Sequence, residues 1–404
     1  MSLPSTYYDL VCHLRPYVVD FAEQDALDLL EEDDPPAAIH SVDDYESQFS
    51  QCIEALEEQT LGPVALQTGR SIEYLKRHLP DEQARASLTG LYATVMQEYH
   101  CVVNFMLAGR KTFHFSDNLA EHLAHTEINL KAGMVDLPFT SCLFTFTSRA
   151  VINAMHDTRL GSSGGADPNR NVAGVDYSAP ISAFLTMHPA DAGLPGRKLV
   201  ISAWHARVPG NVYFMLKREL YLGDDWTLEQ ALRTEWETLS PQTATAGLNI
   251  DTIDGVVSHQ GDETFYTDGL SFYRILLNAV LYLSSSQAEL TPRLSARPAH
   301  NVIDDIRSDK KWRKTRQAAL RVSELDYEEV GRSVGRIVVQ RGLEKAVPEG
   351  RAEGSSPLVR FMVRGHWRRQ AHGLAMQERK LIWITPFYKG PDLATLINKP
   401  YVVK

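Results

Sequence analysis

The sequence predicts an α+β protein with a helical N-terminal region, a mixed central domain built on a mainly antiparallel sheet, and a small basic β-rich C-terminal module. Apolar residues recur at helical spacing through the first third of the chain, and aromatic and β-branched runs follow it. At 404 residues the chain exceeds what one hydrophobic core usually organises. We therefore predict three regions, at residues 1–136, 137–292 and 293–404.

The N-terminal region is predicted to be helical from the spacing of its apolar side chains. Phe49, Ile53 and Leu56 recur at intervals of three and four residues, which places them on one face of a helix. Residues 72–79 repeat this pattern, and Leu88–Phe105 is apolar enough for a longer, more deeply buried helix.

The central domain is predicted to alternate strands with covering helices. Phe139–Phe146, Leu199–Ala206 and Val212–Leu216 are rich in aromatic and β-branched residues, which is typical of strands. Trp226–Trp236 and Phe272–Leu283 have the apolar spacing of helices that pack against a sheet.

The C-terminal module is predicted to begin after an irregular stretch. Ser284–His300 has the composition of a linker, and Asp305–Arg321 is predicted to be a basic helix or arm. Beyond it we predict a short strand within Val330–Gln340 and two more at Leu358–Gly365 and Lys380–Pro386.

Cysteine spacing and hydropathy indicate the compartment. The four cysteines are far apart and form no CxxC pair, so we expect free thiols in a reducing cytosol. The first twenty residues lack the basic and apolar segments of a signal peptide. No run approaches the roughly 18 apolar residues of a membrane helix, so we predict a cytoplasmic protein without a membrane partner.

Charge is distributed unevenly along the chain. Up to Pro292 there are 18 Lys and Arg against 39 Asp and Glu, whereas from Arg293 onward there are 23 against 12. Such asymmetry predicts either that the C-terminal part meets a polyanion or that it docks on the acidic body.

No standard catalytic motif is present. The loop Gly161–Gly165 lacks the phosphate-binding patterns GxxxxGK[ST] and GxGxxG, and is typical of a flexible connection. There is no GxSxG nucleophile elbow, and the carboxylates around His259 fit a polar loop as well as a catalytic site. We therefore predict a protein that acts by binding, without a cofactor.

Two histidines, His122 and His125, lie three residues apart. On a helix both imidazoles would share a face, as metal binding requires. HExxH spacing is absent, and His114 is a third ligand only by proximity, so surface histidines are the other interpretation.

A cluster of cations around one tryptophan forms a candidate nucleic-acid-binding arm. Its cations suit phosphate contacts and its ring suits base stacking; a solvated helix face or docking on the acidic body is the alternative. The residues are Lys310, Lys311, Trp312, Arg313, Lys314 and Arg316.

The C-terminal strings VRGHWRRQ and RKLIWITPFYKGPD form the densest chemical feature. Arg364, His366, Trp367, Arg368 and Tyr388 are suited to binding phosphate, stacking on bases or titrating near neutral pH. Ribonuclease-like proton transfer by His366, Arg368 and Tyr388 is one alternative.

A structural role is the other alternative for this block. Trp367 and Trp383 would fill a small core, and Gly365 and Gly390 would serve turns.

These two strings resemble the C-terminal signature of a family carried by phages and plasmids, one member of which is an anti-CRISPR protein directed at the type V-A CRISPR effector nuclease. The resemblance covers residues 363–392 and extends more weakly to the segment around Leu137-Pro-Phe139. The matching residues are Gly365, His366, Trp367, Arg368, Trp383, Pro386, Lys389, Gly390 and Pro391, with Arg364 beside them.

The resemblance implies a regulator that recognises the N-terminal segment of its target during translation and lowers the level of the encoding mRNA. Its partners would be a nascent or N-terminal peptide, with RNA, the ribosome or a host nuclease as further partners. A nucleic-acid-binding protein or a ribonuclease acting through the basic C-terminal module is the alternative function.

Overall fold

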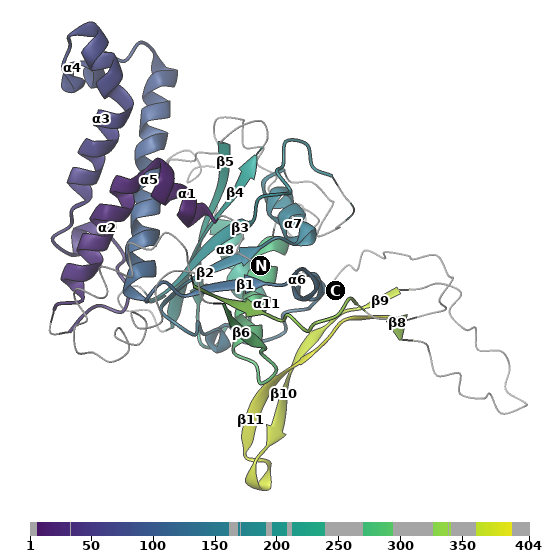
Figure 1. Ribbon diagram of the computed structural model, residues 1–404. Coiled ribbons are helices and arrows are strands. Elements are labelled where there is room, and N and C mark those ends of the chain that lie inside the picture. The colour runs from purple at the N-terminus through teal and green to yellow at the C-terminus, as the bar shows by residue number, and fades with distance from the viewer. Residues whose placement is uncertain are drawn as a thin grey trace, which may run out of the picture.

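The computed structural model describes residues 6–32, 34–160, 169, 171–190, 196–207, 212–238, 270–293, 326–337, 339–340 and 361–389. Within these ranges the predicted α+β class is confirmed: a helical N-terminal region stands beside a seven-stranded, mostly antiparallel sheet, and short strands follow at the C-terminus (Figure 1).

The N-terminal region is a bundle of helices. It contains α1 (Tyr7–Leu14), α2 (Pro16–Leu29), the 3₁₀ turn η1 (Val42–Asp44), α3 (Phe49–Thr68), α4 (Ile72–Arg77) and α5 (Glu82–Leu107). The Asp81 carboxylate accepts from the Ala84 amide at 2.7 Å and caps α5. Gly69, at φ 68°, ends α3 in the left-handed conformation that glycine adopts without strain.

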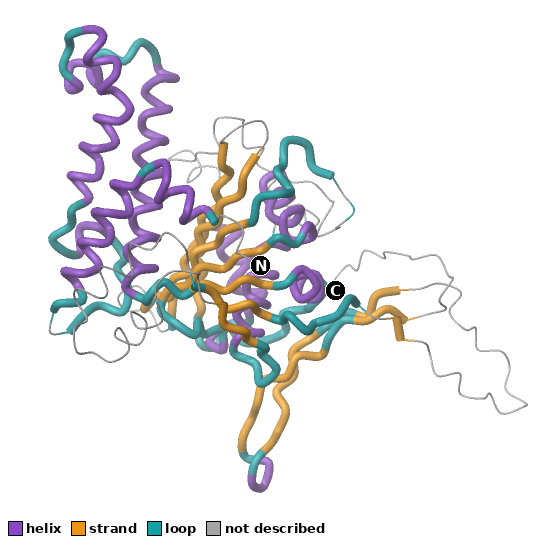
Figure 2. Tube along the Cα trace, in the orientation of Figure 1, coloured by secondary structure: helices purple, strands orange, loops and turns teal. Residues whose placement is uncertain are grey.

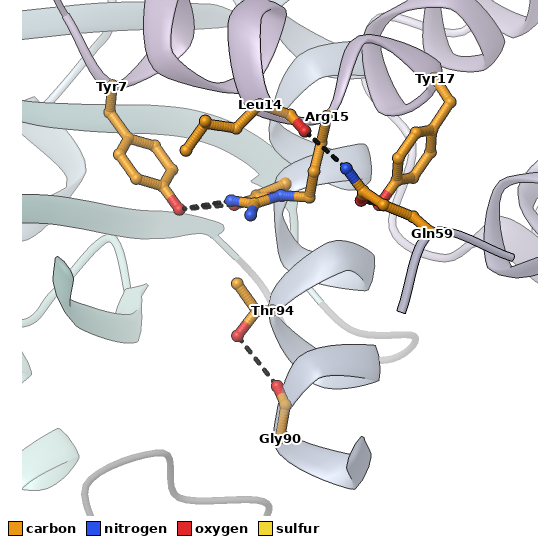
Figure 3. Close-up of polar contacts among 8 residues, drawn as sticks. Tyr7, Leu14, Arg15, Tyr17, Gln59, Gly90 and Thr94 are labelled. Atoms are coloured by element: carbon orange, nitrogen blue, oxygen red, sulfur yellow. Dashed lines mark hydrogen bonds and ion pairs between the residues drawn. The ribbon is translucent and has the colours of Figure 1, made fainter. Parts of the chain in front are cut away.

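Polar contacts hold these helices together. Arg15 Nε donates to Glu98 Oε2 at 2.7 Å, and the Tyr7 hydroxyl donates to Glu98 Oε1 at 2.5 Å. Figure 3 shows the Arg15 guanidinium reaching Tyr7 while the Gln59 amide reaches the Leu14 carbonyl, the latter at 3.1 Å. The start of the chain is thereby fixed to both α3 and α5.

The central sheet has the strand order β5-β4-β3-β2-β1-β7-β6. Its strands are β1 (Thr112–Phe115), β2 (Ser141–Phe146), β3 (Ile181–Pro189), β4 (Arg197–Arg207), β5 (Val212–Leu222), β6 (Leu290–Arg293) and β7 (Tyr327–Val330). Strand β1 pairs in parallel with β2 and β7, and the other neighbours are antiparallel.

Each face of this sheet is buried against helices. On one face, Leu143, Phe184 and Trp204 join a core made with α1, α2, α3 and α5. On the other face, Phe144 and its neighbours pack on α6 (Asp117–Ala124), α7 (Arg149–Leu160), α8 (Leu228–Thr238) and α11 (Ser271–Leu283). Successive strand residues therefore serve opposite cores, as the pleat requires.

The C-terminal part forms two small sheets. Strands β10 (His366–His372) and β11 (Glu378–Ile384) make an antiparallel hairpin around the short turn η4 (Leu374–Met376). A second sheet has the order β8 (Val339–Gln340), β12 (Phe387–Lys389) and β9 (Phe361–Val363). The hairpin projects away from the body in Figure 2.

Two sequence predictions are corrected here. Ser284–His300 is not wholly a linker, because Leu290–Arg293 forms β6; its Pro292 is tolerated since β6 is an edge strand that pairs only with β7 among the described strands. The strand predicted within Val330–Gln340 is interrupted. Gly331, at φ 67°, turns the chain after β7, where an added Cβ would lie 2.4 Å from Leu119 Cδ2.

Other elements were predicted at nearly their observed positions. These are α3, α5, β2, β4, β5, α8, α11, β9 and β11, whereas the strands β1, β3, β10 and β12 were not predicted. The division at residues 136 and 292 stays a prediction; the central sheet takes strands from all three regions.

The four cysteines are free thiols, as predicted. In the part of the chain that the structure describes, no helix is long and apolar enough to cross a membrane.

Candidate functional site

The candidate site is the β10–β11 hairpin, which carries most of the described C-terminal signature. Trp367 lies directly opposite Trp383 at the root of the hairpin, and His372 lies opposite Glu378 near its tip. The root lies against α11 and the segment after α6, and the remainder extends outward (Figure 1).

Two buried tryptophans anchor the root. Their ring centroids are 6.2 Å apart with an interplanar angle of 26°. The Trp367 indole nitrogen donates to Asn278 Oδ1 at 2.8 Å, and the Trp383 indole nitrogen donates to Thr126 Oγ1 at 3.1 Å. The structural interpretation of both tryptophans is therefore the one that the contacts support.

Asn278, on α11, organises this anchor. Its amide nitrogen donates to the Leu123 carbonyl at 3.0 Å and to the Thr126 carbonyl at 2.8 Å, while its oxygen accepts from Trp367. The side chain is fully buried, so each of these bonds replaces one to water. Sequence reasoning missed Asn278; the signal was an amide inside the apolar run LLNAVLYL.

Gly365 joins the hairpin root to the body through its backbone. Its N–H donates to the His125 carbonyl at 3.0 Å, and its own carbonyl accepts from the Glu127 N–H at 2.8 Å. A Cβ at this position would lie 2.7 Å from Thr126 Oγ1 and 2.9 Å from the Ile384 carbonyl oxygen. Close backbone approach accounts for this glycine.

Beyond the root the hairpin exposes cations. Arg364, at its base, lies 3.7 Å from Glu127 across a solvent-exposed ion pair. Two exposed arginines follow on β10, and a third lies on β11 beside a half-buried lysine. These four residues are Arg368, Arg369, Arg379 and Lys380. The hairpin thus presents positive charge on a body whose sequence is acidic.

The tip is apolar and its backbone is strained. The Leu374 side chain is 92% exposed and that of Met376 is 64% exposed. Ala375 and Met376 have φ of 54° and 59°, in the left-handed region that non-glycine residues rarely adopt. Strained backbone of this kind costs free energy, and the exposed side chains beside it gain nothing from burial.

The three candidates for ribonuclease-like chemistry are distributed over two sheets. His366 and Arg368 occupy alternate positions on β10, where their cross-strand neighbours are Ile384 and Ile382. Tyr388 lies on β12, opposite Met362. The residues paired with His366 and Arg368 are therefore aliphatic and offer no group for proton transfer.

His122 and His125 belong to the hairpin anchor. His122 Nε2 donates to the Gly335 carbonyl at 3.1 Å, and its ring packs 5.8 Å from that of Trp383. Burial, with smaller contributions from Arg364 and His122, lowers the pKa of His125 to about 4. Nowhere in the described ranges do three or more metal-ligating side chains come together.

Several predicted residues lie outside the described ranges. These are the basic arm (Lys310, Lys311, Trp312, Arg313, Lys314, Arg316), the loop Gly161–Gly165, His259, and the signature residues Gly390 and Pro391. Pro386 is buried beside Gly365, and Lys389, at the end of β12, is exposed.

The fold and the hairpin define an α+β protein with a projecting basic hairpin. A family model described as AcrVA2-like, the anti-CRISPR type V subtype A2 family, matches residues 113–388, which include most of the central sheet and the whole hairpin. The chain belongs to this family, as the C-terminal signature predicted.

The crystal structure of AcrVA2 is similar to this chain at 12% sequence identity and a TM-score of 0.39, with 94% of this chain and 96% of that chain covered. No curated protein sequence matches the chain.

Proposed function

We propose that this protein is an anti-CRISPR-like regulator of a mobile genetic element. It recognises the nascent or N-terminal peptide of a target protein and lowers expression of the mRNA that encodes it. The family match over residues 113–388 is the observation that carries this proposal. The resemblance of the C-terminal signature supplies the mechanism.

The charge of the chain up to Pro292, the acidic body, supports the proposal that this part binds the peptide. The 39 acidic residues up to Pro292 favour a target segment rich in Lys and Arg, for which electrostatic complementarity raises specificity and association rate. Strand β5 is the outer strand at one end of the sheet and pairs only with β4 among the described strands. An extended peptide adds to such an edge through main-chain hydrogen bonds.

The hairpin is suited to the second partner in this proposal. Arg368, Arg369 and Arg379 offer charge-assisted contacts to phosphate, and the exposed Leu374 and Met376 offer an apolar contact at the tip. A ribosome or an mRNA presents the phosphates that such a hairpin would meet.

The test separates recognition of peptide from recognition of RNA. Tagged protein is recovered from host lysate with and without RNase, and the proteins and RNA that accompany it are identified. The first codons of the recovered target are then fused to a reporter. A frameshifted leader of nearly identical nucleotide sequence but different peptide sequence serves as the matched control.

Loss of reporter mRNA with the in-frame leader alone supports the proposal. Loss with both leaders points to RNA recognition, and loss with neither contradicts a peptide-triggered mechanism. Binding of the peptide should persist in the full-length variant with Arg368→Gln and Arg369→Gln, because the acidic body is proposed to read it.

The second candidate is a nucleic-acid-binding protein or ribonuclease acting through the basic C-terminal module. The exposed arginines of the hairpin favour binding. For catalysis, His366→Ala should abolish RNA cleavage while leaving RNA binding intact; for binding alone, Arg368→Gln with Arg369→Gln should weaken RNA association and reduce its salt dependence.

A further inference from the structure

A polar cleft lies between helix α5 and the sheet, away from the hairpin. Its cavity volume is about 90 Å³, and it is partly open to solvent. Strands β3, β4 and β5 form one wall, and α5 with the loop at residues 39–40 forms the other. The helical wall lies outside the residues matched by the family model, whereas the strands lie within them.

The strand register brings the polar side chains of this wall together. His188 on β3 pairs with Lys198 on β4, and Ser202 on β4 pairs with Lys217 on β5. Glu219 pairs with Val200 one row away. Because side chains two residues apart share a face of a sheet, all these residues face α5.

The two walls are fixed by buried amides. Gln97 Nε2, on α5, donates to Ser202 Oγ at 2.8 Å. Asn104 lies two turns further along the same face of α5. It accepts from the Ile39 N–H at 2.8 Å and donates to the Ile39 carbonyl at 3.1 Å. The cleft is thus preformed, with its loop held in place.

His188 gives the cleft an unsatisfied buried group. Its side chain is 4% exposed, and its Nδ1 has no hydrogen-bond partner. The centroid of its ring lies 4.1 Å from that of His40. A buried polar atom without a partner is costly, so a bound group that supplied one would be stabilised there.

The charged groups of the cleft favour an anion. Lys198 Nζ lies 3.3 Å from one oxygen of Glu219, and Lys217 Nζ lies 3.4 Å from the other. Two ammonium groups therefore share one carboxylate, and each has three donors. Burial first, and then the neighbouring His40 and Lys198, lower the pKa of His188 to about 4, so its neutral ring acts through a single N–H.

We propose that this cleft binds a phosphoryl group, with Lys198 and Lys217 supplying charge and the buried His188 donating through its Nδ1–H. A tetrahedral oxyanion has enough acceptor sites for all three donors. Inorganic phosphate and the phosphate of a nucleoside monophosphate carry the same chemistry, and their relative affinities identify the source.

The experiment titrates the full-length protein with inorganic phosphate, and separately with adenosine 5′-monophosphate, by isothermal calorimetry at an ionic strength held constant with sodium chloride. We expect saturable one-to-one binding. His188→Gln and Lys198→Gln should each weaken binding about tenfold, the loss of one charge-assisted hydrogen bond. Tighter binding of the nucleotide than of phosphate identifies a nucleotide as the source; equal affinity identifies the free ion.

The matched control is Lys131→Gln, which removes a lysine that lies 3.5 Å from Asp225, outside the cleft, and should leave binding unchanged. Circular dichroism checks that each variant folds. If His188→Gln does not fold, the partly exposed pair Lys198→Gln and Lys217→Gln decides. The proposal is overturned if neither probe binds, or if Lys131→Gln weakens binding as much as Lys198→Gln does.

Discussion

The Trp367 indole nitrogen donates a 2.8 Å hydrogen bond to Asn278, a residue 89 positions earlier on a different element. The same amide donates to the carbonyls of Leu123 and Thr126. One buried side chain therefore ties the C-terminal hairpin to helix α11 and to the segment after α6.

Asn278→Leu should destabilise the protein substantially. Leucine has the same branched arrangement of side-chain heavy atoms as asparagine, but it leaves the Trp367 N–H and the Thr126 carbonyl buried without partners; the Leu123 carbonyl still accepts from the Thr126 N–H at 3.2 Å. Each such group costs about 1–3 kcal/mol, so we expect a loss of about 2 kcal/mol or more in the free energy of unfolding. Urea denaturation measures it.

Trp367→Phe completes the comparison for this bond. It removes the indole donor and leaves only Asn278 Oδ1 unsatisfied, so its cost should be smaller. The double variant should lose less free energy of unfolding than the sum of the losses in the two single variants, because both substitutions remove the same hydrogen bond. Strict additivity would show that Asn278 and Trp367 do not interact.

Gly365→Ala should also be destabilising, by about 2 kcal/mol. The added methyl would meet Thr126 Oγ1 at 2.7 Å and the Ile384 carbonyl oxygen at 2.9 Å, and the latter is backbone that cannot rotate away. Thermal unfolding of the full chain reports the change.

Gly90→Ala is the control for that substitution. Nothing lies within 4 Å of a Cβ at Gly90, which is inside helix α5. Here alanine should stabilise by about 0.5–1 kcal/mol through helix propensity alone. Equal effects at the two glycines would contradict the close approach described at Gly365.

Side-chain composition explains which strands were predictable. Strands β2, β4 and β5 are rich in aromatic and β-branched residues, so the sequence identifies them. Strand β10 (HWRRQAH) is missed because it projects from the body and buries only Trp367. A strand without a buried face has no apolar alternation to recognise.

The site was predictable only in part. The signature block was singled out, and a core role for Trp367 and Trp383 was one of its two interpretations. The roles of Asn278 and Thr126 were not predicted, because a single sequence does not show which distant residues come into contact. The polar cleft was missed for the same reason: His188 and Lys198 become neighbours only through the pairing of β3 with β4.

The hairpin tip should be more important for function than for stability. Leu374→Ser and Met376→Ser replace side chains that are 92% and 64% exposed, so thermal stability should change little. If the tip contacts a partner, the reduction in target mRNA should weaken severalfold in the reporter assay. Unchanged activity in both variants would exclude the tip as a contact.

Ala375→Gly tests the strain at this tip separately. At φ 54° alanine is destabilised by about 1 kcal/mol, whereas glycine has no Cβ and is not destabilised in this conformation. We expect slower hydrogen exchange of the β10 and β11 amides in the variant. Faster exchange would mean that the turn gains nothing from release of this strain.

The buried pair His156 and His205 should make stability depend on acid. His205 Nε2 lies 3.1 Å from the Ala179 carbonyl and must donate to it, so His205 Nδ1 accepts from His156 Nε2 at 2.9 Å. Burial lowers the pKa of His205 to about 4. Protonation of Nδ1 would place two N–H groups face to face, which explains why the neutral ring is preferred.

The direction of the effect follows from this pKa. The unfolded chain takes up the proton near pH 6.5, well before the folded protein does. The contribution of His205 to the free energy of unfolding is therefore fully present above about pH 6.5. It declines as the pH falls toward 4, by about 1 kcal/mol per pH unit. In His205→Gln the amide keeps hydrogen-bonding capacity but does not titrate. We therefore expect the free energy of unfolding, measured by urea denaturation between pH 4.5 and 7, to depend on pH with a slope smaller by about one proton. A variant with the same slope as the unmodified protein would show that another group controls its acid sensitivity.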